Sequence, residues 1–414
     1  MPTETLMMKD SGIDCIAEIP ENWDISRIKY DATFYNGDRS EEYPSGNDII
    51  DEGIPFVNSE NIHGTFLDVS SCKCITNEKY KKLGGAKLKI NDIVFCLRGS
   101  VGNCSINKSI NEGTVASSLV AIRANNINPD FLNYYLNSDS TVFQTSLFQN
   151  GSCAANLSAE KVSNYYICTP ILKEQQAIVN FLDEKCVKID KVIGEIEEQI
   201  QVLEDYKKSL ITETVTKGLD KNVPMKDSGI NWIGKIPANW DIKKLKYCCR
   251  ICNGAEYADI EVSDGGYPVM GSGGEFARAS KYSYDKESVL LGRKGTIDKP
   301  LYVDSPFWAV DTMFYTKINK NMYPKFLYYS ATKIRFDYYV TATALPSMTQ
   351  RDLGSEPLTI PPYNIQMQIA DYLDKECAKI DTTINDKKEQ LETIKEYKKS
   401  LIYEYVTGKK RVAC

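Results

Sequence analysis

The stretch FLDEKCVKID at Phe181–Asp190 returns as YLDKECAKID at Tyr372–Asp381, and DYKKSLITETVT at Asp205–Thr216 returns as EYKKSLIYEYVT at Glu396–Thr407. Both matches have the same offset of 191 residues, so the chain contains one long segment in two copies. Neither copy has an internal proline, so each favours one uninterrupted helix. At about 1.5 Å per residue, each helix would be on the order of 60 Å long.

Apolar residues recur in both copies at alternating steps of four and three, which is typical of a coiled-coil seam. A helix with one narrow apolar stripe is not stable alone, and its own second copy is the most economical partner. Polar Lys207, Lys387 and Lys398 interrupt the stripe and are expected to set its register. The predicted seam residues are Leu182, Ile189, Ile193, Ile196, Ile200 and Leu203 in the first helix, and Leu373, Ile380, Ile384, Leu391, Ile394 and Leu401 in the second.

The rest of the chain is duplicated as well. A motif that we call the Pro-Trp motif, MKDSGIDCIAEIPENWDISRIKY at Met8–Tyr30, returns as MKDSGINWIGKIPANWDIKKLKY at Met225–Tyr247, with 15 of 23 positions identical. Its proline and tryptophan predict a turn followed by an apolar anchor, and we assign the motif a structural role only. Short β-type runs between Gly, Asn, Asp and Ser clusters dominate both halves. Two Pro-x-Phe-Leu segments, at Pro129 and Pro324, each predict an amphipathic helix.

These patterns predict an α+β fold with a pseudo-two-fold internal repeat. Two mixed α/β globules, residues 1–168 and 218–359, are joined by two long helices, residues 169–217 and 360–414, which form an antiparallel coiled coil. We expect the globules at opposite ends of the helices and the N-terminal motif near the end of the second half. One chain would thus imitate a symmetric dimer. DNA-binding dimers read two half-sites, and since the two globules, here called reading heads, differ in sequence, their half-sites should differ too.

The composition is that of a globular protein, with 42% hydrophobic and 26% charged residues. No apolar run is long enough to span a membrane, and the N-terminus does not resemble a secretory signal. Thirteen cysteines without framework spacing predict a reducing, cytoplasmic location.

The charge pattern neither demands nor excludes nucleic acid. The net charge is −6, with 14 basic and 21 acidic residues in 1–169, and 19 basic and 16 acidic residues in 218–359. Any DNA contact is therefore expected to be local, with much of the phosphate neutralisation left to partner subunits.

Catalytic and metal motifs are incomplete. The single histidine, His63, cannot form a His–Glu zinc motif, and the groups Cys72–Cys74 and Cys248–Cys252 lack the second spaced pair of a zinc site. Ile360–Tyr363 has isoleucine where an amino-methyltransferase motif needs a polar residue. Gly271–Gly274 lacks the ending of a P-loop, so it is either a turn that offers N–H groups to phosphate or a plain turn. We predict no catalytic residue and no metal site.

The repeated motifs together resemble a known family. Glu174–Ile178, Phe181–Asp190, Glu396–Lys409 and Met225–Trp240 are similar to the helix and inter-domain motifs of the specificity subunit of type I restriction–modification enzymes. The resemblance covers essentially the whole chain.

This resemblance implies a non-catalytic, DNA-binding subunit. Each globule would be a target recognition domain that reads one half of a bipartite, asymmetric double-stranded DNA site. The helices would act as a ruler and as a docking face for two modification (methyltransferase) subunits, which restriction and translocase subunits join in the full complex. S-adenosylmethionine, ATP and Mg are then expected in those partners, with no cofactor bound by this chain.

DNA contacts are expected from loop residues whose donors reach phosphate or base edges. Arg98 and Lys294 are the strongest candidates, because a basic residue beside a glycine turn recurs in both copies. The candidates in the first globule are Asn58, Ser59, Asn61, Lys87, Arg98, Ser100, Gln149 and Asn150, and those in the second are Ser272, Arg278, Lys281, Arg293, Lys294, Thr296, Thr343 and Ser347. For each, the alternative is a solvated surface loop.

Two other functions remain open from the sequence. The chain could be the recognition portion of a fused restriction–methylation enzyme, which would require a cofactor loop and an intact Pro-Pro-Tyr motif. It could also be a coiled-coil scaffold that does not bind DNA.

Overall fold

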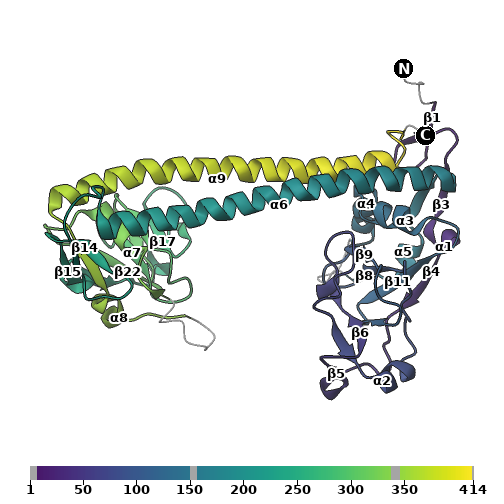
Figure 1. Ribbon diagram of the computed structural model, residues 1–414, viewed down its shortest axis with the longest axis horizontal. Coiled ribbons are helices and arrows are strands. Elements are labelled where there is room, and N and C mark those ends of the chain that lie inside the picture. Colours follow the sequence, from purple (N-terminus) through teal and green to yellow (C-terminus); the bar gives the residue numbers. More distant parts are fainter. Residues whose placement is uncertain (1–6, 150–155, 337–345, 413–414) are drawn as a thin grey trace. The chain divides into compact units, whose positions relative to one another are not determined.

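The computed structural model describes residues 7–149, 156–336 and 346–412. It divides the chain into two compact units. Unit 1 comprises Met1–Ile196 and Glu389–Cys414, and unit 2 comprises Glu197–Lys388. The two long helices therefore each contribute one part to unit 1 and the other part to unit 2 (Figure 1).

Unit 1 alternates short strands with short helices before its first long helix. Its strands are β1 (Met8–Asp10), β2 (Glu18–Pro20), β3 (Asp24–Arg27), β4 (Ala32–Asn36), β5 (Ile49–Ile50), β6 (Ile54–Val57), β7 (Lys73–Ile75), β8 (Ile93–Cys96), β9 (Cys104–Ile106), β10 (Thr114–Val115), β11 (Leu119–Ala124) and β12 (Tyr166–Thr169). Its short helices are α1 (Ile28–Asp31), α2 (Asn77–Lys82), α3 (Pro129–Leu136), α4 (Asp139–Gln149) and α5 (Ala159–Ser163), with 3₁₀ turns η1 (Gly46–Asp48) and η2 (Ser59–Asn61).

The centre of unit 1 is an antiparallel sheet in the order β4-β11-β8-β9. All four residues of β8 are buried because both faces of the sheet are covered. Ile93 and Phe95 point into the cluster that contains α3, whereas Val94 and Cys96 point into a second cluster beneath the sheet β10-β6-β7-β5. A strand buried on both faces is apolar throughout, which explains the continuous run IVFC.

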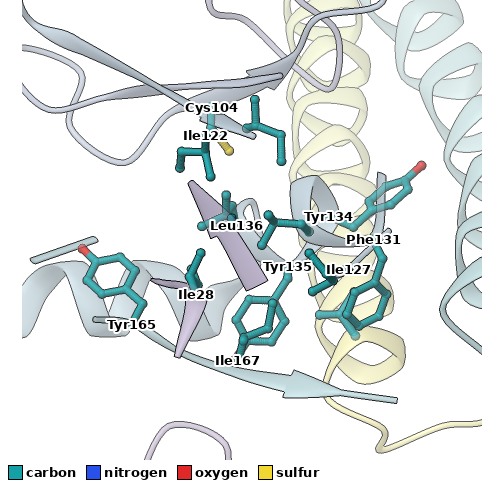
Figure 2. Packing of buried hydrophobic residues seen from close by; sticks show 14 of the residues in the cluster. Ile28, Cys104, Ile122, Ile127, Phe131, Tyr134, Tyr135, Leu136, Tyr165 and Ile167 are labelled. Carbon is teal, nitrogen blue, oxygen red and sulfur yellow. The ribbon is translucent and has the colours of Figure 1, made fainter. Parts of the chain in front are cut away.

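The α3 helix provides several large side chains of the first cluster. Asn128 caps it by accepting hydrogen bonds from the backbone N–H groups of Asp130 and Phe131, and Pro129 occupies its first turn. Figure 2 shows Phe131 and Tyr135 of this helix among the buried residues of the cluster. The predicted proline-started helix is thereby confirmed.

Unit 2 repeats the architecture of unit 1. Its strands are β13 (Met225–Asp227), β14 (Lys235–Pro237), β15 (Asp241–Lys244), β16 (Cys249–Asn253), β17 (Tyr267–Gly271), β18 (Gly274–Ala279), β19 (Ser288–Gly292), β20 (Leu301–Val303), β21 (Trp308–Ala309), β22 (Met313–Ile318) and β23 (Pro357–Ile360). Its short helices are α7 (Pro324–Ala331) and α8 (Gln350–Ser355), with 3₁₀ turns η3 (Leu245–Tyr247) and η4 (Ala258–Ile260).

The sheet order of unit 2 is β16-β22-β19-β20, the counterpart of β4-β11-β8-β9. The second sheet of each unit contains one parallel pair, β10 with β6 in unit 1 and β21 with β17 in unit 2. The duplication predicted from diverged sequence is therefore confirmed in the order and pairing of the strands.

The long helices are α6 (Leu172–Lys217) and α9 (Tyr363–Val406). The second is shorter than the predicted range 360–414, because β23 ends at Ile360 and the chain leaves the helix before Gly408, which has φ +74°. Glycine in this left-handed conformation is a common helix terminator.

The two helices are antiparallel within each unit. In unit 1 the rings of Phe181 and Tyr405 lie 4.4 Å apart between centroids, and farther along α6 Asp190 pairs with Lys398 at 2.6 Å. In unit 2 Lys207 pairs with Asp381 at 2.6 Å. Every predicted seam residue is buried or half-buried, as a seam between the helices requires.

Lysines at the seam interruptions pair across the two helices. Lys398–Asp190 and Lys207–Asp381 are the same contact in the two copies, and Lys387 donates to Gln199 Oε1 at 2.5 Å. Both aspartates are about half exposed, so each ion pair contributes only about 0.2–1 kcal/mol to stability. Their effect is mainly to fix the register, since a shifted seam would leave the charges unpaired.

The Pro-Trp motif anchors each helix end. Trp23 is fully buried in the cluster that also holds Leu401 and Val406 of α9. Trp240 is buried with Val215 of α6 in the matching cluster of unit 2. The N-terminal motif thus packs against the end of the second helix, which confirms that the chain closes on itself in unit 1.

Two matched glycines permit a close backbone crossing next to each main sheet. A Cβ on Gly37 would lie 2.1 Å from the carbonyl oxygen of Ala116, and one on Gly254 would lie 1.9 Å from that of Val310. We expect Gly37→Ala to lower the free energy of unfolding of unit 1 by about 1–3 kcal/mol or more, because a backbone atom must move to make room for the new Cβ. Chemical denaturation would measure the loss of unfolding free energy, and hydrogen exchange would show which segments are destabilised.

The matched control is Gly194→Ala on α6, where a new Cβ meets nothing within 4 Å. It is expected to leave stability unchanged or to raise it by up to about 1 kcal/mol, since alanine favours helix more than glycine does. Equal stability of the Gly37→Ala and original proteins would contradict the close crossing.

Among the residues described here, we find no helix with the length and apolarity needed to cross a bilayer.

Candidate nucleic-acid interface

In unit 1, Arg98 lies on a tight turn directly after β8. Gly99 follows in the left-handed conformation, with φ +75°. The carbonyl of Leu97 accepts a hydrogen bond from the N–H of Leu157 at 2.9 Å, and Arg98 forms a β-bridge with Asn156. The backbone is held on both sides of Arg98, and its side chain is exposed.

Unit 2 has the same turn directly after β19. Gly295 has φ +80°, the carbonyl of Arg293 accepts from the N–H of Met348 at 3.0 Å, and Lys294 forms a β-bridge with Ser347. The Lys294 side chain is exposed. The structural equivalence of Arg98 and Lys294 is therefore confirmed, while their contact with DNA stays a prediction.

The turn in unit 1 borders a surface hollow of about 400 Å³. Arg39 and Lys161 also line it, and neither was among the predicted contacts. Arg39 donates from Nη2 to the carbonyl of Ser117 at 3.3 Å, and Lys161 donates from Nζ to that of Phe148 at 3.4 Å. Among the described residues, the lining consists of Asn36, Arg39, Arg98, Asn156, Leu157, Ser158, Ala159, Glu160 and Lys161.

Several other predicted contacts lie on the surface. Ser100 in unit 1, and Lys281, Thr296 and Ser347 in unit 2, are exposed. Ser272 is half-buried at the tip of the hairpin between β17 and β18. Their positions are compatible with a nucleic-acid contact but do not test one.

Asn61 is the clearest correction. It is 1% exposed, its Oδ1 accepts the N–H of Asn58 at 3.0 Å, and its Nδ2 donates to Ser71 at 3.3 Å. The Asn58 side chain in turn accepts the N–H of Glu60 at 2.7 Å, with half-buried Ser59 between them in η2. Asn58 and Asn61 therefore stabilise the turn, and the buried Asn61 amide does not reach a DNA surface.

Lys87 is also engaged inside unit 1. Its ammonium lies 3.8 Å from the centroid of the Tyr80 ring and donates to the carbonyl of the same residue. Burial lowers the pKa of Lys87, because the charged form loses solvation. A free phosphate-binding lysine at this position is thus not supported.

The two arginines predicted in unit 2 are held by neighbours. Arg278 pairs with Glu275 at 3.1 Å and donates to the carbonyl of Gly266 at 3.1 Å. Arg293 is half-buried and donates to the carbonyl of Asp311 at 3.2 Å. Asn150, Thr343 and the side chain of Gln149 lie outside the described residues.

In the part of the chain that the structure describes, no cluster of three or more His, Cys, Asp or Glu is arranged to hold an ion. Burial raises the pKa of Cys72 to about 11 and that of Cys249 to about 12.

Comparison with known proteins gives a consistent family. Residues 20–202 and 237–393 match the type I restriction modification DNA specificity domain. The chain is 25% identical over 423 residues to a Methanocaldococcus jannaschii protein described as a type I restriction enzyme MjaX specificity subunit, covering 96% of each chain. It is 25% identical over 263 residues to the MjaVIII specificity subunit of that organism, covering 61% of this chain and 55% of the relative.

A solved structure has the same fold. One similar chain comes from a structure that describes complex assembly and conformational transition of the type I R-M system. The similarity has a TM-score of 0.71 at 16% sequence identity, and it covers 94% of this chain and 98% of that one. At this identity the likeness shows the fold alone. The family match covers both units, and specificity subunits are the non-catalytic components of their systems. With its duplicated sheets, paired helices and both family matches, the chain belongs to the type I restriction–modification DNA specificity family.

Proposed function

We propose that this chain selects a bipartite, asymmetric double-stranded DNA site, with one half-site read by each unit. The observation that carries the proposal is the repeated basic turn, with Arg98 in unit 1 and Lys294 in unit 2 at the same exposed place of the same fold, where a basic side chain can position each unit on DNA. The surroundings of the two turns differ in sequence. Two similar folds with different contact residues are expected to read two different half-sites.

The proposal includes scaffolding of two methyltransferase subunits and, through them, of restriction subunits. S-adenosylmethionine, ATP and Mg would be bound by those partners and not by this chain. The support is that the long helices carry exposed aromatic residues at repeat-matched positions. Tyr206 is 56% exposed and Tyr397 is 58% exposed.

Exposed tyrosines at matched positions are suited to be anchors of two equivalent protein contacts, because tyrosine contributes strongly at the centres of interfaces. We expect Tyr206→Ala or Tyr397→Ala to weaken the binding of one methyltransferase subunit by roughly 30-fold or more, which corresponds to about 2 kcal/mol. The double variant should weaken both. Native mass spectrometry of the co-expressed complex would count the bound subunits.

Thr393→Ala on the exposed surface of α9 is the control, and it should leave the subunit count unchanged. Full assembly by the double tyrosine variant, at concentrations where dissociation of the weakened complex is expected, would show that these side chains are not anchors.

The proposed function is tested by co-expressing the chain with its methyltransferase and mapping methylated adenines on genomic DNA by single-molecule sequencing. One split motif with a fixed spacer is the expected result and gives both half-sites at once. Methylation without a split motif would refute bipartite selection. An assembled, cofactor-competent complex that neither methylates nor binds DNA selectively would instead favour the coiled-coil scaffold.

A further inference from the structure

The hollow beside Arg98 concentrates positive charge in an otherwise acidic part of the chain. Residues 1–169 hold 14 basic and 21 acidic residues, yet Arg39, Arg98 and Lys161 all line this one hollow, with Glu160 as the single acidic residue among the described part of its lining. All three basic side chains are exposed. Arg39 and Lys161 donate to backbone carbonyls, and none of the three forms an ion pair with a residue that the structure describes.

The sheet explains how these distant residues come together. Asn36 at the end of β4 pairs with Val120 at the start of β11, and the neighbouring Leu119 pairs with Cys96 at the end of β8. The segments that follow β4 and β8 therefore leave the sheet at the same end of its strands. The bridge from Arg98 to Asn156 adds the segment before α5, which carries Lys161.

The matched positions of unit 2 do not make a cationic site. The internal repeat places Glu256 where unit 1 has Arg39, and Asp352 where unit 1 has Lys161. Arg351 stands where unit 1 has Glu160, so with Lys294 the four positions carry two positive and two negative charges. The Asp352 carboxylate is also occupied, since it accepts from the N–H and the hydroxyl of Thr349 at 3.1 and 2.7 Å.

We propose that Arg39, Arg98 and Lys161 form a binding site for DNA backbone phosphates, and that it exists in unit 1 only. The inference rests on the proposed function and deepens it, because it assigns a defined cluster of phosphate contacts to the half-site that unit 1 reads. Three exposed cations around an open hollow suit a polyanion, whereas base reading by arginine needs a side chain aligned by fixed neighbours.

The test uses the chain assembled with its methyltransferase subunits and a duplex that carries its mapped site. Affinity is measured over a series of salt concentrations for the original complex and for the Arg39→Ala/Lys161→Ala variant. Each lost phosphate contact should reduce the slope of log affinity against log salt by about 0.9, so the double variant should lose about 2. Arg98→Ala alone should lose about 0.9, with a similar loss of affinity on unrelated duplexes.

The control is Glu256→Ala, which changes the position of unit 2 that matches Arg39 and should not reduce the slope. The methylated motif should stay the same in all variants, because phosphate contacts carry no sequence information. An unchanged slope in the double variant would overturn the phosphate site. A motif altered in one half-site by these substitutions would also overturn it, since the residues would then be reading bases.

Failure of the two proposals can be told apart. If the original complex shows no site-selective binding, the proposed function fails and the phosphate site fails with it. If the original complex binds its site with a steep salt dependence that the variants keep, only the phosphate site fails. Thermal unfolding of each variant checks that the exposed substitutions leave the fold intact.

Discussion

Replacing both Ile193 and Ile384 with glutamate is expected to abolish site-specific methylation by the assembled complex. Ile384 is 6% exposed and Ile193 is half-buried, each on the seam of its own unit. The Lys207–Asp381 pair sets the register that brings Ile384 opposite the α6 residues just before Lys207. An unpaired carboxylate at such a position costs on the order of 3 kcal/mol or more, because it loses water without gaining a partner.

The seam has little energy to spare against that cost. The ion pairs that accompany it are half-exposed and weak, so apolar burial supplies most of the helix pairing. With the pairing lost in both units, the helices no longer fix the distance between the two reading heads in the proposed mechanism. Genomic methylation mapping is the measurement, with thermal unfolding of the variant chain in parallel.

Val187→Glu is the matched control for this experiment. Val187 is on the same helix but 68% exposed, so a carboxylate there keeps its water and should leave thermal unfolding unchanged. Unchanged methylation by the double isoleucine variant would refute the role of the helices as a ruler, whatever the effect on stability.

Replacing the core of unit 2, residues 248–358, with the corresponding segment of another family member is expected to change one half-site of the methylated motif and leave the other intact. The reason is that unit 1 has its own sheets and its own clusters of buried residues, and none of the hydrogen bonds of its basic turn depends on unit 2. The change in specificity should be complete, since every recognition loop of unit 2 is exchanged.

The structure sharpens the boundaries of that exchange. β15 pairs with β23 in the register Asp241↔Ile360 to Lys244↔Pro357, and Thr359 donates to the carbonyl of Val215 on α6. Keeping residues 357–360 from the original chain preserves this strand pair and its contact with the helix. Exchanging 248–356 should therefore give a more stable chimera with the same new half-site. Changes in both half-sites would contradict independent reading heads.

Much of the architecture could be predicted because it depends on local patterns. The apolar steps of four and three predicted α6, α9 and their seam, since a helix presents every third or fourth residue on one face. Lys207 and Lys398 were expected only to set the register, and the structure shows that their partners are the repeat-matched Asp381 and Asp190. The Pro-Trp motif predicted an apolar anchor, and Trp23 is fully buried.

The loop residues were less predictable, because loop sequence does not reveal which polar groups satisfy one another. Asn61 has the composition of a surface loop residue, yet its amide completes a 3₁₀ turn and is buried. Lys87 follows a glycine pair in the sequence. In the structure its ammonium is covered by the aromatic ring of Tyr80, which lies seven residues earlier in the chain. Both pairings needed the folded backbone.

By itself, the sequence determined the duplication, the two long helices, their seam and the equivalence of Arg98 and Lys294, because periodicity and repetition are written along the chain. Only the tertiary structure decided that Arg39 and Lys161 join Arg98 around one hollow. The strand order β4-β11-β8 brings segments more than fifty residues apart to the same end of a sheet. The density of positive charge at that end depends on this non-local pairing, which no local pattern encodes.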